Sequence, residues 1–115
     1  MELLALSAAC GADPEAGTTR AQLSSSKIIS RELTGVGVFT HFKTDSENLI
    51  EDTDGGVLRG SQGVSLSHPE LEHGADVIVW VENGKMDCLE MVTFGAEKWP
   101  FHGEFQLSPT NHETL

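Results

Sequence analysis

The stretch GADVIVWVENGKMDCLEMVTFG, residues 74–95, decides the fold of this chain. Two runs rich in β-branched and other apolar residues meet at Asn83-Gly84, the dipeptide typical of a two-residue type I′ turn. The pattern therefore predicts a β-hairpin made of residues 75–82 and 85–94. Both runs carry apolar residues at odd and even positions, which is typical of strands in the centre of a sheet with both faces covered.

A two-residue turn also predicts the register of the hairpin. Glu82 lies opposite Lys85, as a favourable cross-strand charge pair. Counting onward from that pair places Glu90 opposite Val77, on the face that carries the other valines of the first strand and Cys88. This register predicts a carboxylate among apolar side chains.

A carboxylate in such a place requires a partner, because an unpaired buried charge is costly. Arg31 is the partner that we predict for Glu90, and Arg59 and His73 are the alternatives. A structural salt bridge is favoured over a catalytic or ligand-binding role for this carboxylate.

Outward from the hairpin, the chain predicts short helices before it and short strands around it. A helix is expected over residues 2–9 and a second one around 19–24, with Gly11, Pro14 and Gly17 as breakers near them. Gly35, between the next two expected strands, and Gly37, within the second of them, indicate a bulge or the close approach of another backbone. An acidic connection without periodicity fills residues 44–56, and Trp99-Pro100 marks a turn. The other strands are expected at residues 27–33, 36–43, 57–59, 64–67 and 104–107.

These elements predict one α+β domain over residues 1–115, mainly antiparallel β. Short connections cannot make parallel crossovers, so the strands pair antiparallel. We expect a helical or irregular segment at 1–26, packed on a curled antiparallel sheet at 27–108 with the hairpin at its centre, and a polar tail at 109–115.

The charge of the chain restricts its partners. Among 115 residues there are 18 acidic and 7 basic ones, for a formal net charge of −11. Binding to a phosphate backbone depends on Lys and Arg that displace counterions, and there is no basic stripe here. Nucleic acid and anionic membrane surfaces are therefore excluded as partners, while a cationic protein remains open.

Two cysteines, Cys10 and Cys88, are too few for a disulfide framework or a Cys-rich zinc site, and we expect a reducing, cytoplasmic compartment. The segment MELLALSAACG is similar to a lipoprotein signal that leads into Cys10. However, it has no Lys or Arg, and Glu2 stands where positive charge belongs. We therefore expect a short helix there, without cleavage or lipidation. No apolar run approaches the length that spans a bilayer.

Three stretches, ISRELTGVGVFTHF, LEHGADVIVWVENGKMDCLE and TFGAEKWP, carry a resemblance to a family of small uncharacterised bacterial proteins. The resemblance covers most of residues 28–100 and departs from the family pattern at Asp76, Met91 and 92–94. It implies one compact domain and no particular activity. The matching positions are Arg31, Glu32, Thr34, Gly35, Gly37, Phe39, Thr40, Leu71, Gly74, Ala75, Gly84, Leu89, Glu90, Gly95, Trp99 and Pro100.

Two acidic stretches suggest metal sites, and we predict that neither is one. SHPELEH places His68, His73 and two glutamates within six residues, but the five-residue spacing and Pro69 do not fit a zinc-binding helix. A solvated loop is the favoured interpretation. The segment at 44–56 resembles a calcium loop, but Ser61 stands where an EF-hand requires Glu. The chain also contains no nucleophile elbow or phosphate-binding loop, so we expect no cofactor.

Two functional hypotheses from different classes follow. The favoured one is a non-catalytic, acidic interaction protein, for which an accessory or immunity-type role beside a basic protein is one example. The alternative is a small metal-assisted hydrolase that uses Glu90 with His41, His68 and His73. We predict no catalytic and no metal-binding residues. The predicted binding residues are Arg31, His41, His73, Glu90 and Trp99.

The apolar residues on both faces of the hairpin also suggest self-association. Large exposed apolar patches usually mark interfaces, and two-fold dimers are the commonest assemblies. We therefore predict a homodimer, with Trp80, Phe94 and Trp99 as contributors. The competing interpretation is a sheet that curls and covers both of its faces within the monomer.

Overall fold

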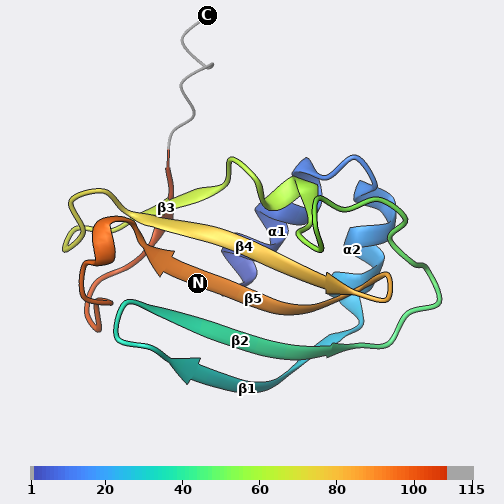
Figure 1. Ribbon diagram of the computed structural model, residues 1–115, viewed down its shortest axis with the longest axis horizontal. Coiled ribbons are helices and arrows are strands. Elements are labelled where there is room, and N and C mark those ends of the chain that lie inside the picture. The colour runs from blue at the N-terminus through green and yellow to red at the C-terminus, as the bar shows by residue number, and fades with distance from the viewer. Residues whose placement is uncertain (1, 109–115) are drawn as a thin grey trace, which may run out of the picture.

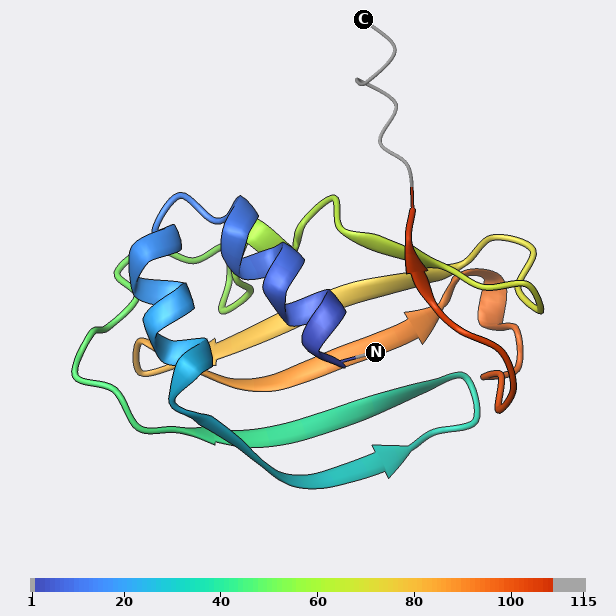
Figure 2. The same ribbon diagram turned by 180° about the vertical axis from the view of Figure 1, so that it is seen from behind.

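The computed structural model describes residues 2–108, in which two N-terminal helices cover one face of a six-stranded sheet (Figures 1 and 2). Every strand pair is antiparallel, which confirms the predicted α+β, mainly antiparallel class. The sheet order is β1-β2-β5-β4-β3-β6, so the hairpin is central as predicted and the sheet is open. The predicted tail at 109–115 lies outside the described residues.

Most elements lie close to where the sequence predicts them. The strand predicted at 57–59 is wrong: Val57 makes only isolated bridges, to Asp54 and Trp80, and a 3-10 turn follows it. The bounds are α1 Glu2–Ala12, α2 Ala16–Ser24, β1 Ser26–Leu33, β2 Gly37–Thr44, η1 Arg59–Ser61, β3 Ser65–Ser67, β4 Ala75–Glu82, β5 Lys85–Thr93, η2 Phe94–Ala96 and β6 Gln106–Leu107.

The hairpin contains a β-bulge that the sequence pattern did not predict. Asn83 and Gly84 both have positive φ, 53° and 78°, as a type I′ turn requires. Glu82 pairs with Lys85 as predicted, but beyond the next pair Trp80 lies opposite Cys88 and Asp87 is left out of the ladder. The predicted register is therefore wrong from this point onward.

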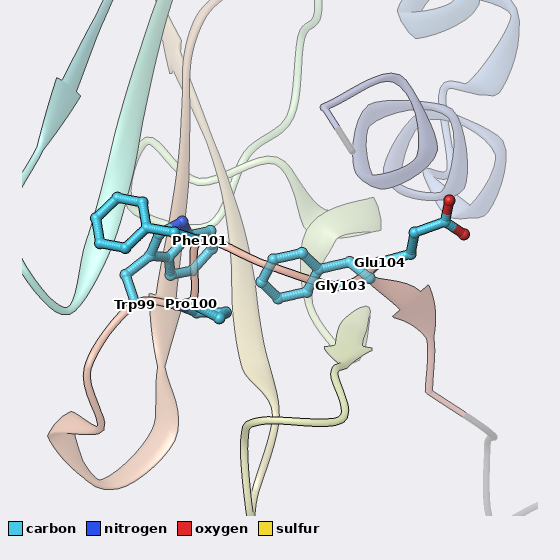
Figure 3. A pocket seen from close by; sticks show the side chains of 6 residues that line it. Trp99, Pro100, Phe101, Gly103 and Glu104 are labelled. Atoms are coloured by element: carbon cyan, nitrogen blue, oxygen red, sulfur yellow. The ribbon is translucent and has the colours of Figure 1, made fainter.

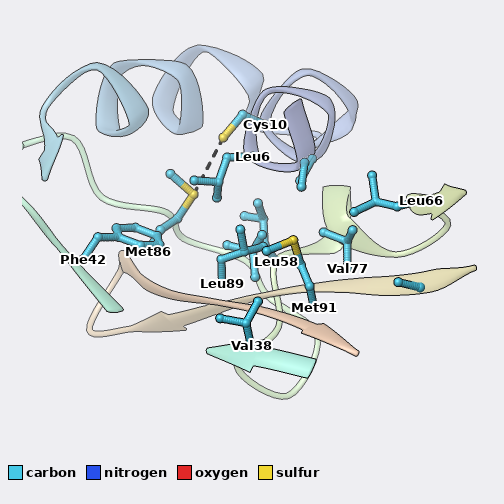
Figure 4. Packing of buried hydrophobic residues seen from close by; sticks show 14 of the residues in the cluster. Leu6, Cys10, Val38, Phe42, Leu58, Leu66, Val77, Met86, Leu89 and Met91 are labelled. Atoms are coloured by element: carbon cyan, nitrogen blue, oxygen red, sulfur yellow. Dashed lines mark hydrogen bonds between the residues drawn. The ribbon is translucent and has the colours of Figure 1, made fainter. Parts of the chain in front are cut away.

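The helix-covered face of the sheet carries the core. Alternate residues of the central strands point toward the helices, among them Val79, Leu89 and Met91, all fully buried. Figure 4 shows Leu6 and Cys10 of α1 reaching down to this layer. The Cys10 thiol lies 3.8 Å from the sulfur of Met86. The remaining buried members are Ala5, Ala9, Val38, Phe42, Ile50, Leu58, Leu66, Leu71, Ala75, Val77, Met86 and Trp99.

Gln22 of α2 is fully buried and holds the end of the hairpin in place. Its side-chain amide donates hydrogen bonds to the carbonyl oxygens of Asn48, at 2.7 Å, and Gly84, at 2.8 Å. Its carbonyl oxygen accepts a hydrogen bond from the amide of Met86 at 3.0 Å. A single side chain therefore joins backbone groups of two separate segments, and it satisfies the buried amide of Met86.

Two glycines allow backbones to approach closely. A Cβ atom at Gly37 would collide with the carbonyl oxygen of Met91 on the neighbouring strand, as the predicted close approach required. At Gly60 a Cβ would collide with the backbone of Ala9 and Asp13 at the end of α1. The Gly60 amide donates to the buried carboxylate of Asp13 at 2.8 Å, which fixes η1 against α1.

Candidate functional site

The face of the sheet opposite the helices, here called the open face, is uncovered in the part of the chain that the structure describes, residues 2–108. Figure 1 looks onto it, and the helices lie behind the strands. The register places two rows of side chains across it from β1 to β4. One row is Glu32, Phe39, Glu90 and Ile78, and the other is Ser30, His41, Cys88 and Trp80.

Trp80 and Glu90 are joined on the open face. The indole Nε1 of Trp80 donates a hydrogen bond to Oε1 of Glu90 at 3.1 Å, and the Trp80 residue is 38% exposed. Phe39 and His41 stack beside them, with ring centroids 6.4 Å apart. The bulge therefore puts Glu90 among aromatic side chains on the open face, and its predicted place on the face of the core valines is wrong.

The predicted Arg31–Glu90 salt bridge is also wrong, because Arg31 points to the helix side of the sheet. Its guanidinium donates two hydrogen bonds to Glu2 of α1, at 2.6 Å from Nε and 2.8 Å from Nη2. The hydroxyl of Thr40 donates to the same carboxylate at 2.6 Å. Arg31 thus ties the start of α1 to β1 and belongs to the structural framework.

This arrangement predicts a pH-dependent contribution to stability. The hydrogen bond from Arg31 lowers the pKa of Glu2 below its usual 4.5, against the opposing effect of burial. A lowered folded-state pKa stabilises the fold above pH 4.5, and this contribution is lost as the pH falls below that value. The variant Glu2→Gln should therefore be less stable than the wild type at pH 7, and the difference should shrink under acidic conditions. Urea unfolding of both proteins across this range measures it, and a difference that stays constant with pH contradicts the assignment.

The bulge brings carboxylates together on the open face. Burial raises the pKa of Asp87, and a hydrogen bond shared with Glu82 raises it further. Burial also raises the pKa of the Cys88 thiol to about 11, with the charges of Asp87, Glu90 and Glu32 adding to the effect. A thiol with so high a pKa is a poor nucleophile.

A second candidate site is a hollow of about 480 Å³ formed by the chain from Trp99 to Phe105 (Figure 3). Trp99, predicted to bind a ligand or a second copy, is only 5% exposed, and its ring lies 4.9 Å from that of Phe105. The ring of His68 also packs against Phe105, with centroids 4.7 Å apart. Phe101 stands outward with 69% of its surface exposed. The hollow can hold an apolar group, but it is lined by a single carboxylate, from Glu104.

The histidines of the hydrolase hypothesis do not meet. His68 is buried, and its Nδ1 accepts a hydrogen bond from the amide of Glu70 at 3.0 Å. It is the exception in the loop predicted to be mostly exposed, since Glu70 and Glu72 are exposed as predicted. His73 is exposed in the turn before β4, 3.9 Å from Glu72. His41 lies on the open face, diagonal to Glu90. Within residues 2–108 no three His, Cys, Asp or Glu side chains gather closely enough to hold a metal ion.

Comparisons with protein-family models, with curated proteins and with solved structures find no match to this chain. The resemblance of residues 28–100 to small bacterial proteins therefore stays a prediction. Neither described helix has the length and apolar character needed to cross a bilayer.

Proposed function

We propose that this protein is a non-catalytic interaction protein that binds a cationic protein partner. The observation that carries the proposal is the open face, a broad sheet surface on which aromatic side chains stand among carboxylates. The net charge of −11 supports a basic partner, since complementary charge speeds encounter and suppresses wrong partners.

The hydrolase alternative gains no support from the geometry. Glu90 and His41 lie on the open face, and His68 packs beside Phe105. His73 lies in an exposed turn. A metal-assisted mechanism needs ligands and a general base around one reacting atom, and these side chains are too dispersed to provide them.

Affinity capture from the native host followed by mass spectrometry tests the proposal. We expect a basic protein to be enriched, and the purified partner should bind the purified chain one to one, with an affinity that falls as salt is raised. As a control, the same capture is repeated with the chain unfolded in urea and then immobilised. If no basic protein binds the folded chain in preference to the unfolded one, the proposal fails.

A further inference from the structure

On the open face, apolar side chains of a regular sheet remain without a covering element in the described chain. Its centre is formed by Phe39, Ile78, Trp80 and Val92 from three adjacent strands. Trp80 is 38% exposed, and the other three are partly exposed. Exposed aromatic side chains on a rigid sheet are the kind of residue that contributes most of the free energy at protein interfaces.

Carboxylates border this apolar centre, and no basic side chain of residues 2–108 forms an ion pair with them. Lys85 lies opposite Glu82 in the ladder, yet no salt bridge joins the two. Lys27 and Lys43 lie opposite each other on β1 and β2, also outside the salt bridges of the described chain. The carboxylates of the open face are Glu32, Asp76, Glu82, Asp87 and Glu90.

The chemistry around Trp80 fits a positively charged side chain. Its indole is oriented by the hydrogen bond to Glu90, and the bulge carries Asp87 and Glu82 to the same end of the face. An indole ring attracts Lys and Arg through its π-face, and adjacent carboxylates strengthen that attraction. The two neighbouring carboxyl groups repel each other when both are ionised, and a cation placed between them removes that repulsion.

We propose that the open face docks a cationic segment of a partner protein, with an Arg or Lys side chain of that segment lying on Trp80 among Glu82, Asp87 and Glu90. This inference rests on the proposed function and locates its binding surface. A second copy of this chain is the less favourable occupant, because it would bring one set of these carboxylates toward another. The open face also carries Lys27, Lys43 and Lys85, so carboxylates outnumber lysines on it, and this excess favours a basic partner.

The test uses a short peptide of alternating Arg and Leu as the probe and a peptide of alternating Glu and Leu as its control. Binding is followed by the fluorescence of Trp80, since the other tryptophan, Trp99, is only 5% exposed. Amide chemical shifts then map the contact. We expect the basic peptide alone to bind, with shifts in β2, β4 and β5 on the open face.

Two double variants that change the net charge equally distinguish the contribution of the open face to peptide binding from that of the overall negative charge of the protein. The double variant Asp87→Asn/Glu90→Gln removes two charges from the open face, while the amide introduced at position 90 keeps an acceptor for the indole. The control Glu47→Gln/Glu51→Gln removes two charges from exposed side chains of the segment before η1. We expect the first to weaken the binding of the peptide by about tenfold or more and the second by less than about twofold.

The outcomes distinguish this inference from the proposed function. If the peptide binds but the shifts fall on residues 45–54, or both double variants weaken binding equally, the docking surface is wrong and the cationic-partner function stands. If the basic peptide binds no better than the acidic one, the docking surface and the cationic-partner function are both wrong. Light scattering tests whether a second copy of the chain occupies the open face. If the wild type has twice the mass of 12.4 kDa and the variant Trp80→Ser has a mass of 12.4 kDa, the face belongs to a second copy and the inference is overturned.

Discussion

Replacing Gln22 by Leu is expected to lower the free energy of unfolding by about 2–4 kcal/mol, although Leu is apolar and similar in size. The side chain of Gln22 is fully buried and hydrogen-bonds the carbonyl oxygens of Asn48 and Gly84 and the amide of Met86. The substitution leaves the buried amide of Met86 without a partner, which costs about 1–3 kcal/mol. It also removes two part-buried hydrogen bonds to the carbonyl oxygens of Asn48 and Gly84, each worth about 0.5–1.5 kcal/mol, although the Gly84 carbonyl still accepts from the amide of Ile50. Urea unfolding followed by circular dichroism measures the loss.

The matched control is Gln62→Leu. Gln62 is exposed, and its amide makes one surface hydrogen bond, to Asp54. The same chemical change there should alter the unfolding free energy by no more than about 0.5 kcal/mol. Equal effects at the two positions would mean that the loss at Gln22 does not come from its buried hydrogen bonds, contrary to its role as a connection between α2 and the hairpin.

A second large effect is expected from a single added methyl group at Gly60. Its Cβ would occupy space already filled by the backbone of Ala9 and Asp13, which cannot rotate away as a side chain can. Gly60→Ala should therefore displace η1 from α1 and lower the unfolding free energy by about 3 kcal/mol. The NMR signal of the amide at position 60, which donates to Asp13 in the wild type, should also shift.

Gly17→Ala provides the control for the same substitution in open space. Gly17 lies within α2, and a Cβ there meets nothing within 4 Å. Because Ala has the higher helix propensity, this variant should gain about 0.5–1 kcal/mol. A loss at both positions would contradict the steric explanation for Gly60.

Local patterns in the sequence predicted most of the fold. Asn83-Gly84 predicted the hairpin, because few dipeptides adopt positive φ at both positions. The alternation of apolar residues predicted β2 at Gly37–Thr44, within one residue of its bounds. The prediction near the end of the chain was less accurate: the strand expected at 104–107 comprises only Gln106–Leu107, since short edge strands carry little pattern of their own.

The candidate site was predicted less well, because it depends on which face each residue occupies. Counting along a regular ladder assigned Glu90 to the core face. Arg31 was then named as its partner because a buried carboxylate requires one. Trp99, predicted to contribute to an interface, is buried against Phe105, so that role stays a prediction. Trp80 and Phe94 are 38% and 40% exposed, which leaves them available to a partner. The predicted homodimer remains a prediction.

The bulge at Asp87 has a consequence for how this surface can change during evolution. Met86 faces the core before it, and Leu89 faces the core after it, just as they would in a regular ladder without Asp87. Asp87 is therefore an extra residue in β5 that pairs with no residue of β4. Its deletion would give a regular hairpin in which Met86 and Leu89 still face the core. Insertion or deletion of this one residue can therefore add or remove one negative charge on the open face without changing which residues of the hairpin face the core.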